Sequence, residues 1–310
     1  MSEMNRWKRQ TPPTKRVVLL VLDGLRADLV GDSRFPHLAT LREQSAYTLD
    51  ATTVLPSVTA AAMTSLSAGV SPCDHGITND RFAVPPYLHR LRPLPREVAR
   101  AGLRTTGIVR EVPWPLRPLA RRIVRELGLA QTHFAPPQAR KLLRRALPAL
   151  REQREGLIVM HWPDCDAVGH RDGWMSRSYF EAVSGMDDAL GAMRHALHES
   201  EQDTLLVTLA DHGGGGRVAT HHDSAHPLDC TIPILLSGAG VVPQLLSGTY
   251  TLLDAPPTVL WALGLAVPGQ WTGEPIVEAF RTPDANSVRS LQENGDAVVR
   301  VSDFPRWSVA

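Results

Sequence analysis

Residues 55–80 read LPSVTAAAMTSLSAGVSPCDHGITND. Pro56 suits a tight turn, and the alanines that follow Thr59 favour a helix. Gly69 and Pro72 are typical of the end of such a helix, because glycine adopts the left-handed conformation there and proline cannot continue the hydrogen-bonding pattern. The stretch therefore predicts a turn, a helix that starts at Thr59, and a polar loop.

Thr59 has two possible roles at this position. It could be an N-cap, whose hydroxyl accepts a backbone N–H. It could also be a nucleophile, because the positive end of a helix dipole favours an attacking oxyanion or the phosphoryl group that it attacks. The segment alone favours the cap, whereas the acidic and histidine residues elsewhere in the chain favour the nucleophile.

The chain on both sides of this helix alternates short apolar runs with amphipathic stretches, which predicts an α/β fold with a buried, mainly parallel sheet. The expected strands are 16–22, 48–55, 105–109, 157–161, 204–210 and 232–236. The expected helices are 36–44, 94–101, 119–127, 137–150 and 179–198.

Three of the expected strands end in an aspartate, namely Asp23, Asp166 and Asp211, and two of these bring His170 or His212 within four residues. Strand ends of one parallel sheet meet at one crevice, so we expect these side chains to lie together. Carboxylate and imidazole ligands suit zinc or manganese, and six or seven of them are enough for two ions.

Composition narrows the possible partners and compartments. The 310 residues carry 33 basic and 32 acidic side chains, so no bulk charge favours nucleic acid or a membrane surface. The three cysteines lie far apart, which argues against a disulfide framework or a structural zinc site. With no apolar leader or membrane-length run in the sequence, we expect a cytoplasmic protein.

The chain is expected to form one catalytic domain, with a core over about residues 16–275 and a flexible tail over 1–14. Residues 80–156, which are rich in proline and arginine, are the candidate for a small cap. Their arginines are either a solvated face or a border for an anionic substrate. The sequence leaves the oligomeric state open.

The ordered motifs resemble those of the alkaline phosphatase superfamily, and within it the type I phosphodiesterase/nucleotide pyrophosphatase branch. VLDGLRAD resembles the first metal motif, PSVT with GVSPCDHGI the nucleophile motif, and DAVGH and ADHGG the later metal motifs. LLDAPPTVLWALGLAVPGQWTG (252–273) resembles the closing segment. The resemblance covers residues 16–273 and implies an alkaline-phosphatase-like sandwich, with helices on both faces of a mostly parallel sheet.

The resemblance also implies roles for individual residues. One divalent ion would be held by Asp166, His170 and a late histidine. The other would be held by Asp23, Thr59, Asp211 and His212. The late histidine is His222 by its spacing of eleven residues from Pro233, with His226 as the alternative. Asn79 would bind a phosphate oxygen, and zinc is the expected metal, with manganese as the alternative.

The implied function is hydrolysis of a small phosphorylated substrate, most simply a phosphodiester, through a covalent phospho-threonine on Thr59. Sulfatases need Cys or Ser at this position, and the cofactor-independent phosphoglycerate mutases use Ser and carry a larger insertion than 80–156. The alternatives are a phosphomonoesterase, a phosphonate hydrolase, or a non-catalytic relative that binds metal or phosphate.

Overall fold

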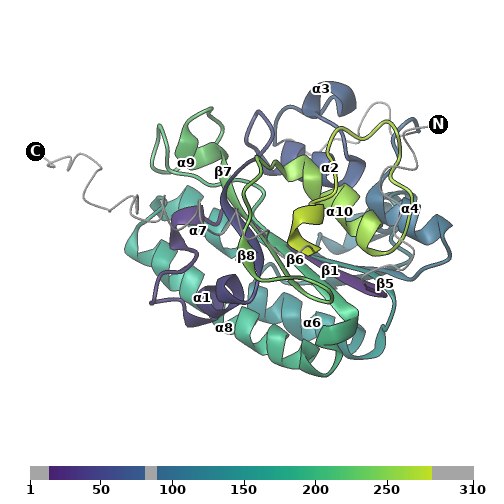
Figure 1. Ribbon diagram of the computed structural model, residues 1–310. Helices are drawn as coiled ribbons and strands as arrows, with labels where there is room; N and C mark the ends of the chain where they lie inside the picture. The colour runs from purple at the N-terminus through teal and green to yellow at the C-terminus, as the bar shows by residue number, and fades with distance from the viewer. Residues whose placement is uncertain (1–13, 81–88, 281–310) are drawn as a thin grey trace, which may run out of the picture. The chain divides into compact units, whose positions relative to one another are not determined.

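The computed structural model describes residues 14–80 and 89–280. These residues contain an eight-stranded sheet with the strand order β4-β3-β5-β1-β6-β7-β2-β8 (Figure 1). The strands are β1 (Arg16–Leu22), β2 (Ala46–Thr52), β3 (Thr105–Arg110), β4 (Gln131–Ala135), β5 (Gly156–Trp162), β6 (Thr204–Leu209), β7 (Thr231–Gly238) and β8 (Gln244–Leu245).

Strand β1 lies in the middle of the sheet. Its sequence RVVLLVL is buried at every position, as expected for a strand that is covered on both faces. It pairs in parallel with β5 on one side, where Leu22 lies opposite Trp162, and with β6 on the other, where Val21 lies opposite Leu209. The carboxyl ends of three adjacent strands therefore lie at the same edge.

The sheet is mostly parallel, as the sequence predicts. Strands β3, β4 and β5 continue the parallel arrangement on one side of β1. On the other side, β7 runs antiparallel to both β6 and β2, and the short β8 is parallel to β2. The antiparallel β7 was not foreseen, because an apolar run carries no signal of strand direction.

Helices cover both faces of the sheet (Figure 1). Helix α8 (Arg177–Leu197) packs against α1, α6 and α7 on one face, and α2 packs against α4 and α10 on the other. The longer helices are α1 (Pro36–Glu43), α2 (Thr59–Ala68), α4 (Leu94–Arg100), α5 (Arg117–Glu126), α6 (Ala139–Glu152), α7 (Asp164–Asp172) and α10 (Ala255–Ala262). The four-residue helices are α3 (Pro72–His75) and α9 (Pro227–Cys230).

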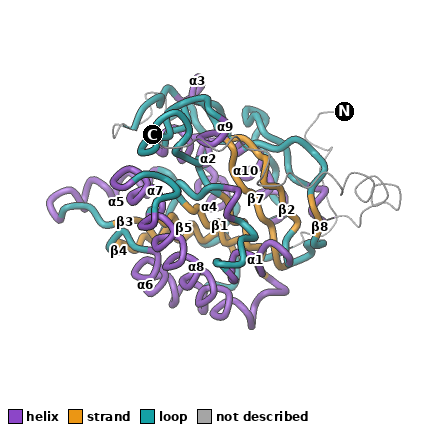
Figure 2. Tube along the Cα trace, turned by 90° about the vertical axis from the view of Figure 1, so that its left-hand side faces the viewer, coloured by secondary structure: helices purple, strands orange, loops and turns teal. Residues whose placement is uncertain are grey.

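The segment 80–156, expected as a possible cap, contributes directly to the sheet. Its described part, residues 89–156, supplies β3 and β4, and α5 lies beside β4 at the edge of the sheet (Figure 2). Sequence reasoning missed β4, whose partly exposed sequence QTHFA has little apolar character. A cap over the site stays a prediction, and the expected tail 1–14 lies almost wholly outside the described residues. Within the described part of the chain, the helices are all too short or too polar to cross a membrane.

Candidate metal and nucleophile site

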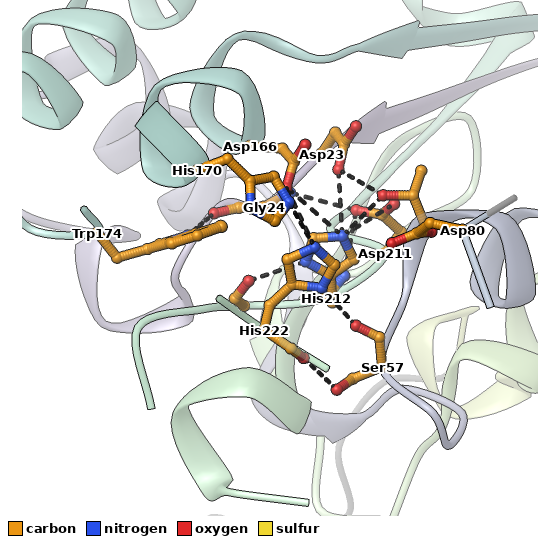
Figure 3. Close-up of polar contacts among 12 residues, drawn as sticks. Asp23, Gly24, Ser57, Asp80, Asp166, His170, Trp174, Asp211, His212 and His222 are labelled. Atoms are coloured by element: carbon orange, nitrogen blue, oxygen red, sulfur yellow. Dashed lines mark hydrogen bonds and ion pairs between the residues drawn. The ribbon is translucent and has the colours of Figure 1, made fainter. Parts of the chain in front are cut away.

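The three strand-end aspartates come together at the carboxyl edge of β5, β1 and β6 (Figure 3). Asp23 follows β1, Asp211 lies two residues beyond β6, and Asp166 lies in the first turn of α7, which follows β5. Asp23 and Asp211 are buried, and the Asp166 side chain is 17% exposed. The three aspartates therefore converge as expected, because they follow neighbouring strands at the centre of the sheet.

A glycine allows the chain to bring two of these acids close. Gly24 has φ +70°, and a Cβ at this position would lie 2.9 Å from the backbone of Asp166. The Asp166 N–H donates to the Asp23 carbonyl at 3.1 Å, and the Gly24 N–H donates to Asp211 Oδ1 at 3.2 Å. The Asp-Gly turn thus joins all three strand ends, and a larger residue would push them apart.

Thr59 is the first residue inside α2, and Val58 occupies the N-cap position. The Thr59 hydroxyl lies 3.0 Å from His212 Nε2 and 3.5 Å from Asp23 Oδ1. The N-cap interpretation of Thr59 is therefore wrong, because its oxygen points into the acidic cluster. This cluster is the site where the sequence predicts a nucleophile.

Three histidines present the same nitrogen to this cluster. His170, His212 and His222 each direct Nδ1 to a backbone carbonyl, of Thr220, Gly213 and Ser57 respectively, at 2.9, 2.8 and 2.6 Å. A carbonyl only accepts, so Nδ1 carries the proton and the neutral ring has a free lone pair on Nε2. This is how proteins orient histidines that bind a metal.

The distances between the donor atoms fit two cation sites. Asp166 Oδ1 lies 3.3 Å from His170 Nε2 and 3.4 Å from His222 Nε2, and these two nitrogens are 3.0 Å apart. His212 Nε2 lies 3.3 Å from Asp23 Oδ1 and 3.7 Å from Asp211 Oδ2. Ligands held tetrahedrally by zinc at about 2.0–2.1 Å lie about 3.3–3.4 Å apart. The two groups meet at His212, whose Nε2 is 4.0 Å from Asp166 Oδ1.

Two carboxylate oxygens in the cluster support the same interpretation. Asp166 Oδ1 and Asp211 Oδ2 are buried and have no hydrogen-bond partner among the described residues. A buried acceptor without a donor is costly, and a carboxylate more so. Each of these atoms is the one that faces the histidine nitrogens, so a bound cation would satisfy both. The donor set therefore fits two divalent ions.

The pKa values of this cluster are strongly shifted, because several carboxylates lie together in a buried position. Burial and the Asp23 charge raise the pKa of Asp166 to about 8 and that of Asp211 to about 6. Burial acts in the same direction on Asp23, but His161 and His212 outweigh it and hold the pKa of Asp23 well below its usual range. Burial opposes the protonation of His212, yet Asp211 and Asp23 raise its pKa to about 10.

The pKa of His222 shifts in the opposite direction to that of His212. Its ring stacks on His212, with centroids 3.7 Å apart and an angle of 3° between the planes. Burial and the His212 charge lower the pKa of His222 to about 4. A neutral His222 is the form that can act as a metal ligand.

The structure separates the two candidates for the late histidine. His222 lies beside Asp166, as given above, whereas His226 is the N-cap of α9, where its Nδ1 accepts from the Leu228 N–H at 3.2 Å. Asn79 is exposed on the loop after α3, and its role in phosphate binding stays a prediction. The residue of this loop that reaches α2 is Asp80, whose Oδ1 accepts the Ala60 N–H at 3.0 Å.

The HGI segment, residues 75–77, holds this loop in place. His75 is fully buried, its Nε2 lies 2.9 Å from Ser65 Oγ on α2, and its Nδ1 accepts the Ile77 N–H at 3.1 Å. Helix α2 itself ends at Gly69, which has φ +68° and packs against the ring of Trp271. The motif thus positions Asp80 beside Thr59 without entering the site.

Sequence reasoning missed three residues at the site, which are His161, Trp174 and Asp80. His161 is the penultimate residue of β5, and its Nε2 lies 3.1 Å from Asp23 Oδ2. Trp174 donates to the Gly24 carbonyl at 2.9 Å and packs edge-on against His170, with centroids 5.4 Å apart. A Cβ at Gly169 would come within 2.6 Å of this ring, so the glycine of DAVGH makes room for Trp174. A lone His within a strand, or a lone Trp after a helix, carries no signal in the sequence.

The fold is shared with solved structures of alkaline-phosphatase-like enzymes. A 2-O GAG sulfatase matches with a TM-score of 0.68 at 12% identity, covering 86% of this chain and 74% of that one. The lipoteichoic acid synthase LtaP from Listeria monocytogenes matches at 0.66 and 18%, covering 91% and 78%. A phosphonate monoester hydrolase from Silicibacter pomeroyi matches at 0.64 and 15%, covering 88% and 78%. At these identities the likeness shows the fold.

Sequence relatives point to the same superfamily. The 2,3-bisphosphoglycerate-independent phosphoglycerate mutase of Aeromonas salmonicida is 28% identical over 138 residues, which is 44% of this chain and 26% of the mutase. The Wolbachia pipientis mutase is 29% identical over 156 residues, or 48% and 29%. The chain thus matches little more than a quarter of the length of these relatives.

The fold is that of the alkaline-phosphatase-like enzymes. The sequence profile of the type I phosphodiesterase/nucleotide pyrophosphatase family matches residues 17–90 and 102–230, more than half of the chain, so the chain belongs to that family.

Proposed function

We propose that this protein hydrolyses phosphodiesters through a covalent intermediate on Thr59, with two divalent ions held at the strand ends. The observation that carries the proposal is the position of the Thr59 hydroxyl, 3.0 Å from His212 Nε2 and 3.5 Å from Asp23 Oδ1. A threonine hydroxyl placed among metal-ligand side chains at the start of a helix is the arrangement of an activated nucleophile.

Each ion has a set of side chains that would hold it. Asp166, His170 and His222 form one set, and Asp23, Thr59, Asp211 and His212 form the other. When bound, the ions would lower the pKa of the Thr59 hydroxyl and offset the negative charge of the phosphoryl group. Zinc fits the imidazole-rich first set, and manganese is the alternative for both.

The groups of the chain itself hold the nucleophile and the substrate in place for the reaction. The positive end of the α2 dipole lies at Thr59 and favours the negative charge of the phosphoryl group. The Thr59 oxygen attacks phosphorus, its proton is released to solvent, and the P–O bond to the leaving oxygen breaks. Water then hydrolyses the bond between phosphorus and Thr59, which restores the hydroxyl and releases a phosphomonoester.

Asp80 supports a diester rather than a monoester as the substrate. Its carboxylate accepts the Ala60 N–H, one residue beyond the nucleophile. A phosphate diester brings one negative charge to this position, whereas a monoester brings close to two at neutral pH. The additional repulsion from Asp80 therefore acts against monoesters.

The test is a comparison of initial rates on two chromogenic esters after reconstitution with zinc or manganese. We expect bis-p-nitrophenyl phosphate to be cleaved with a higher kcat/KM than p-nitrophenyl phosphate. A monoester preference would reassign the protein as a phosphomonoesterase, and preference for a phosphonate monoester would reassign it as a phosphonate hydrolase. Metal binding with no turnover of any of the three would identify a non-catalytic relative.

A further inference from the structure

An apolar cavity of about 350 Å³ lies between α2, α4, α5 and the strands β1, β3 and β5. Its walls are mainly aliphatic and include Met63, Leu66, Leu94, Ile108, Ile123 and Leu127. An engineered apolar cavity of about 150 Å³ is enough to bind benzene. This cavity is therefore large enough for a substantial apolar group.

The cavity reaches the candidate site at two residues. Ala60, which follows Thr59 on α2, lines it, and so does His161, whose Nε2 is 3.1 Å from Asp23 Oδ2. A group attached to a phosphorus atom at Thr59 would therefore start next to a residue of the cavity wall. The phosphate charge would stay at the strand ends, and the apolar group would extend away from them.

Helix α5 forms one wall and leaves its apolar face incompletely covered. Ile123, Val124 and Leu127 line the cavity from this helix and its C-terminal end. Leu116 and Leu119 continue the same helical face toward the surface, where they are 52% and 53% exposed. The arginines of α5 lie on the opposite face, and every residue of the helix is at least partly exposed.

This pattern is unusual for a surface helix. An amphipathic helix normally buries its apolar face against the core, because removal of that face from water is the main source of its stability. Among the described residues, this face lies over a cavity at one end and is exposed at the other. An apolar ligand in the cavity would complete the packing that the described residues leave open.

We propose that the substrate is a phosphodiester that carries an aliphatic chain, and that this chain occupies the cavity between α2, α4 and α5. The inference rests on the proposed function and names its substrate class. An aliphatic chain fits better than a nucleobase, because the edge of a base needs hydrogen-bond partners. The described wall offers only three polar side chains, Thr64, Ser67 and His161. Thr64 donates to the Ala60 carbonyl at 2.7 Å, and His161 Nε2 lies 3.1 Å from Asp23 Oδ2.

The test uses p-nitrophenyl alkyl phosphates with methyl, butyl, octyl and dodecyl groups, all kept at monomeric concentrations. We expect kcat/KM to rise about two- to fourfold for each added methylene until the cavity is filled, and then to level off. A flat series would overturn the proposal. So would a higher kcat/KM for a nucleoside p-nitrophenyl phosphate than for the octyl ester.

Two matched variants on α5 locate the effect. Val124→Trp should fill the cavity and remove the dependence on chain length, while the methyl ester is cleaved as by the wild type. Arg122→Trp adds the same ring to a position on the exposed arginine face and should keep the full dependence. Equal chain-length dependence in both variants would place the alkyl group elsewhere and contradict the assignment.

A binding experiment separates this inference from the proposed function. Calorimetric titration with n-alkyl phosphates reports occupation of the cavity without turnover, and its affinity should rise with chain length in the wild type and not in Val124→Trp. If the methyl ester is not cleaved but this dependence is present, the proposed function fails and the cavity assignment stands. If the methyl ester is cleaved and the chain-length dependence is absent, the proposed function stands and the cavity assignment fails.

Discussion

The Nε2 atoms of His170 and His222 lie 3.0 Å apart, while the Nδ1 atom of each ring is directed to a backbone carbonyl. When both rings are neutral with the proton on Nδ1, their Nε2 lone pairs face each other and repel. The Asp166 Oδ1 atom completes the triangle and has no hydrogen-bond partner among the described residues. A divalent cation bound by these three atoms would replace the repulsion with coordination. The predictions on metal content and on pH depend on this arrangement.

The first prediction concerns metal content. Wild-type protein reconstituted with zinc should carry two ions per chain, and His222→Ala should carry about one, because it removes a ligand of the Asp166 set only. His226→Ala is the matched control: this ring caps α9, so the variant should keep two ions. Inductively coupled plasma mass spectrometry on dialysed protein gives the stoichiometry. Loss of an ion from His226→Ala and not from His222→Ala would reverse the ligand assignment.

The second prediction concerns Thr59. Thr59→Ala should bind metal and fold normally, yet its kcat for a diester should fall by roughly 10³-fold or more, because the attacking oxygen is absent. Thr59→Ser should keep a measurable part of the rate, since it keeps that oxygen with a freer rotamer. Mass spectrometry after a rapid quench should locate the phosphoryl group with its remaining ester group on residue 59 of the wild type. Near-normal turnover by folded Thr59→Ala would mean that water attacks the substrate directly.

The third prediction concerns pH. In the metal-free protein the pKa of Asp166 rises from 3.8 to about 8, so the native state holds a proton that the unfolded state has lost. The stability of the metal-free protein should therefore fall as pH increases between about 4 and 8. His212, with its pKa raised from 6.5 to about 10, acts in the same direction above pH 6.5.

Metal binding should offset this loss of stability at higher pH, because a metal ion binds the deprotonated ligands. The gain in Tm on adding zinc should consequently be larger at pH 8.0 than at pH 6.5, as measured by differential scanning fluorimetry. Asp166→Asn mimics the protonated carboxyl, so its metal-free form should lose less stability over this interval than the wild type. A zinc-induced gain in Tm that is equal at both pH values would refute the assignment of Asp166 as a metal ligand.

The fourth prediction concerns Asp80. Asp80→Asn removes a negative charge beside the α2 N-terminus and should raise kcat/KM for p-nitrophenyl phosphate about fivefold relative to the diester. The effect should weaken at high ionic strength, because Asp80 is exposed. Asp74→Asn, a change on the same loop within the Ser71 capping box, is the control for a general disturbance. An unchanged ester ratio in Asp80→Asn would remove Asp80 from the basis of diester selectivity.

Much of the site could be read from the sequence because strand ends are a local property. Apolar runs such as RVVLLVL identify buried strands, and an aspartate directly after each run lies at the carboxyl edge of a parallel sheet. This pattern predicts that Asp23, Asp166 and Asp211 lie together, as they do in the structure (Figure 3). The ordered motifs then placed Thr59, His170 and His212 with them.

Other features depended on contacts between distant segments, which no local pattern encodes. The direction of β7, the choice of His222 over His226, and the contact of His161 with Asp23 arise from loops that return to the same edge of the sheet. The same is true of Asp80, which stands one residue beyond the expected Asn79 and accepts the Ala60 N–H of α2, while His75 contacts Ser65 of the same helix.

The sequence by itself thus determined the fold class and the convergence of the strand-end acids, and it predicted Thr59 as the nucleophile, because each depends on the order of residues within one element and its following turn. Only the tertiary structure decided that Thr59 faces the acids instead of capping its helix, and that α2 and α5 border an apolar cavity whose wall includes Ala60. Both depend on how α2 and α5 pack on the sheet, and packing geometry is a property of many residues acting together.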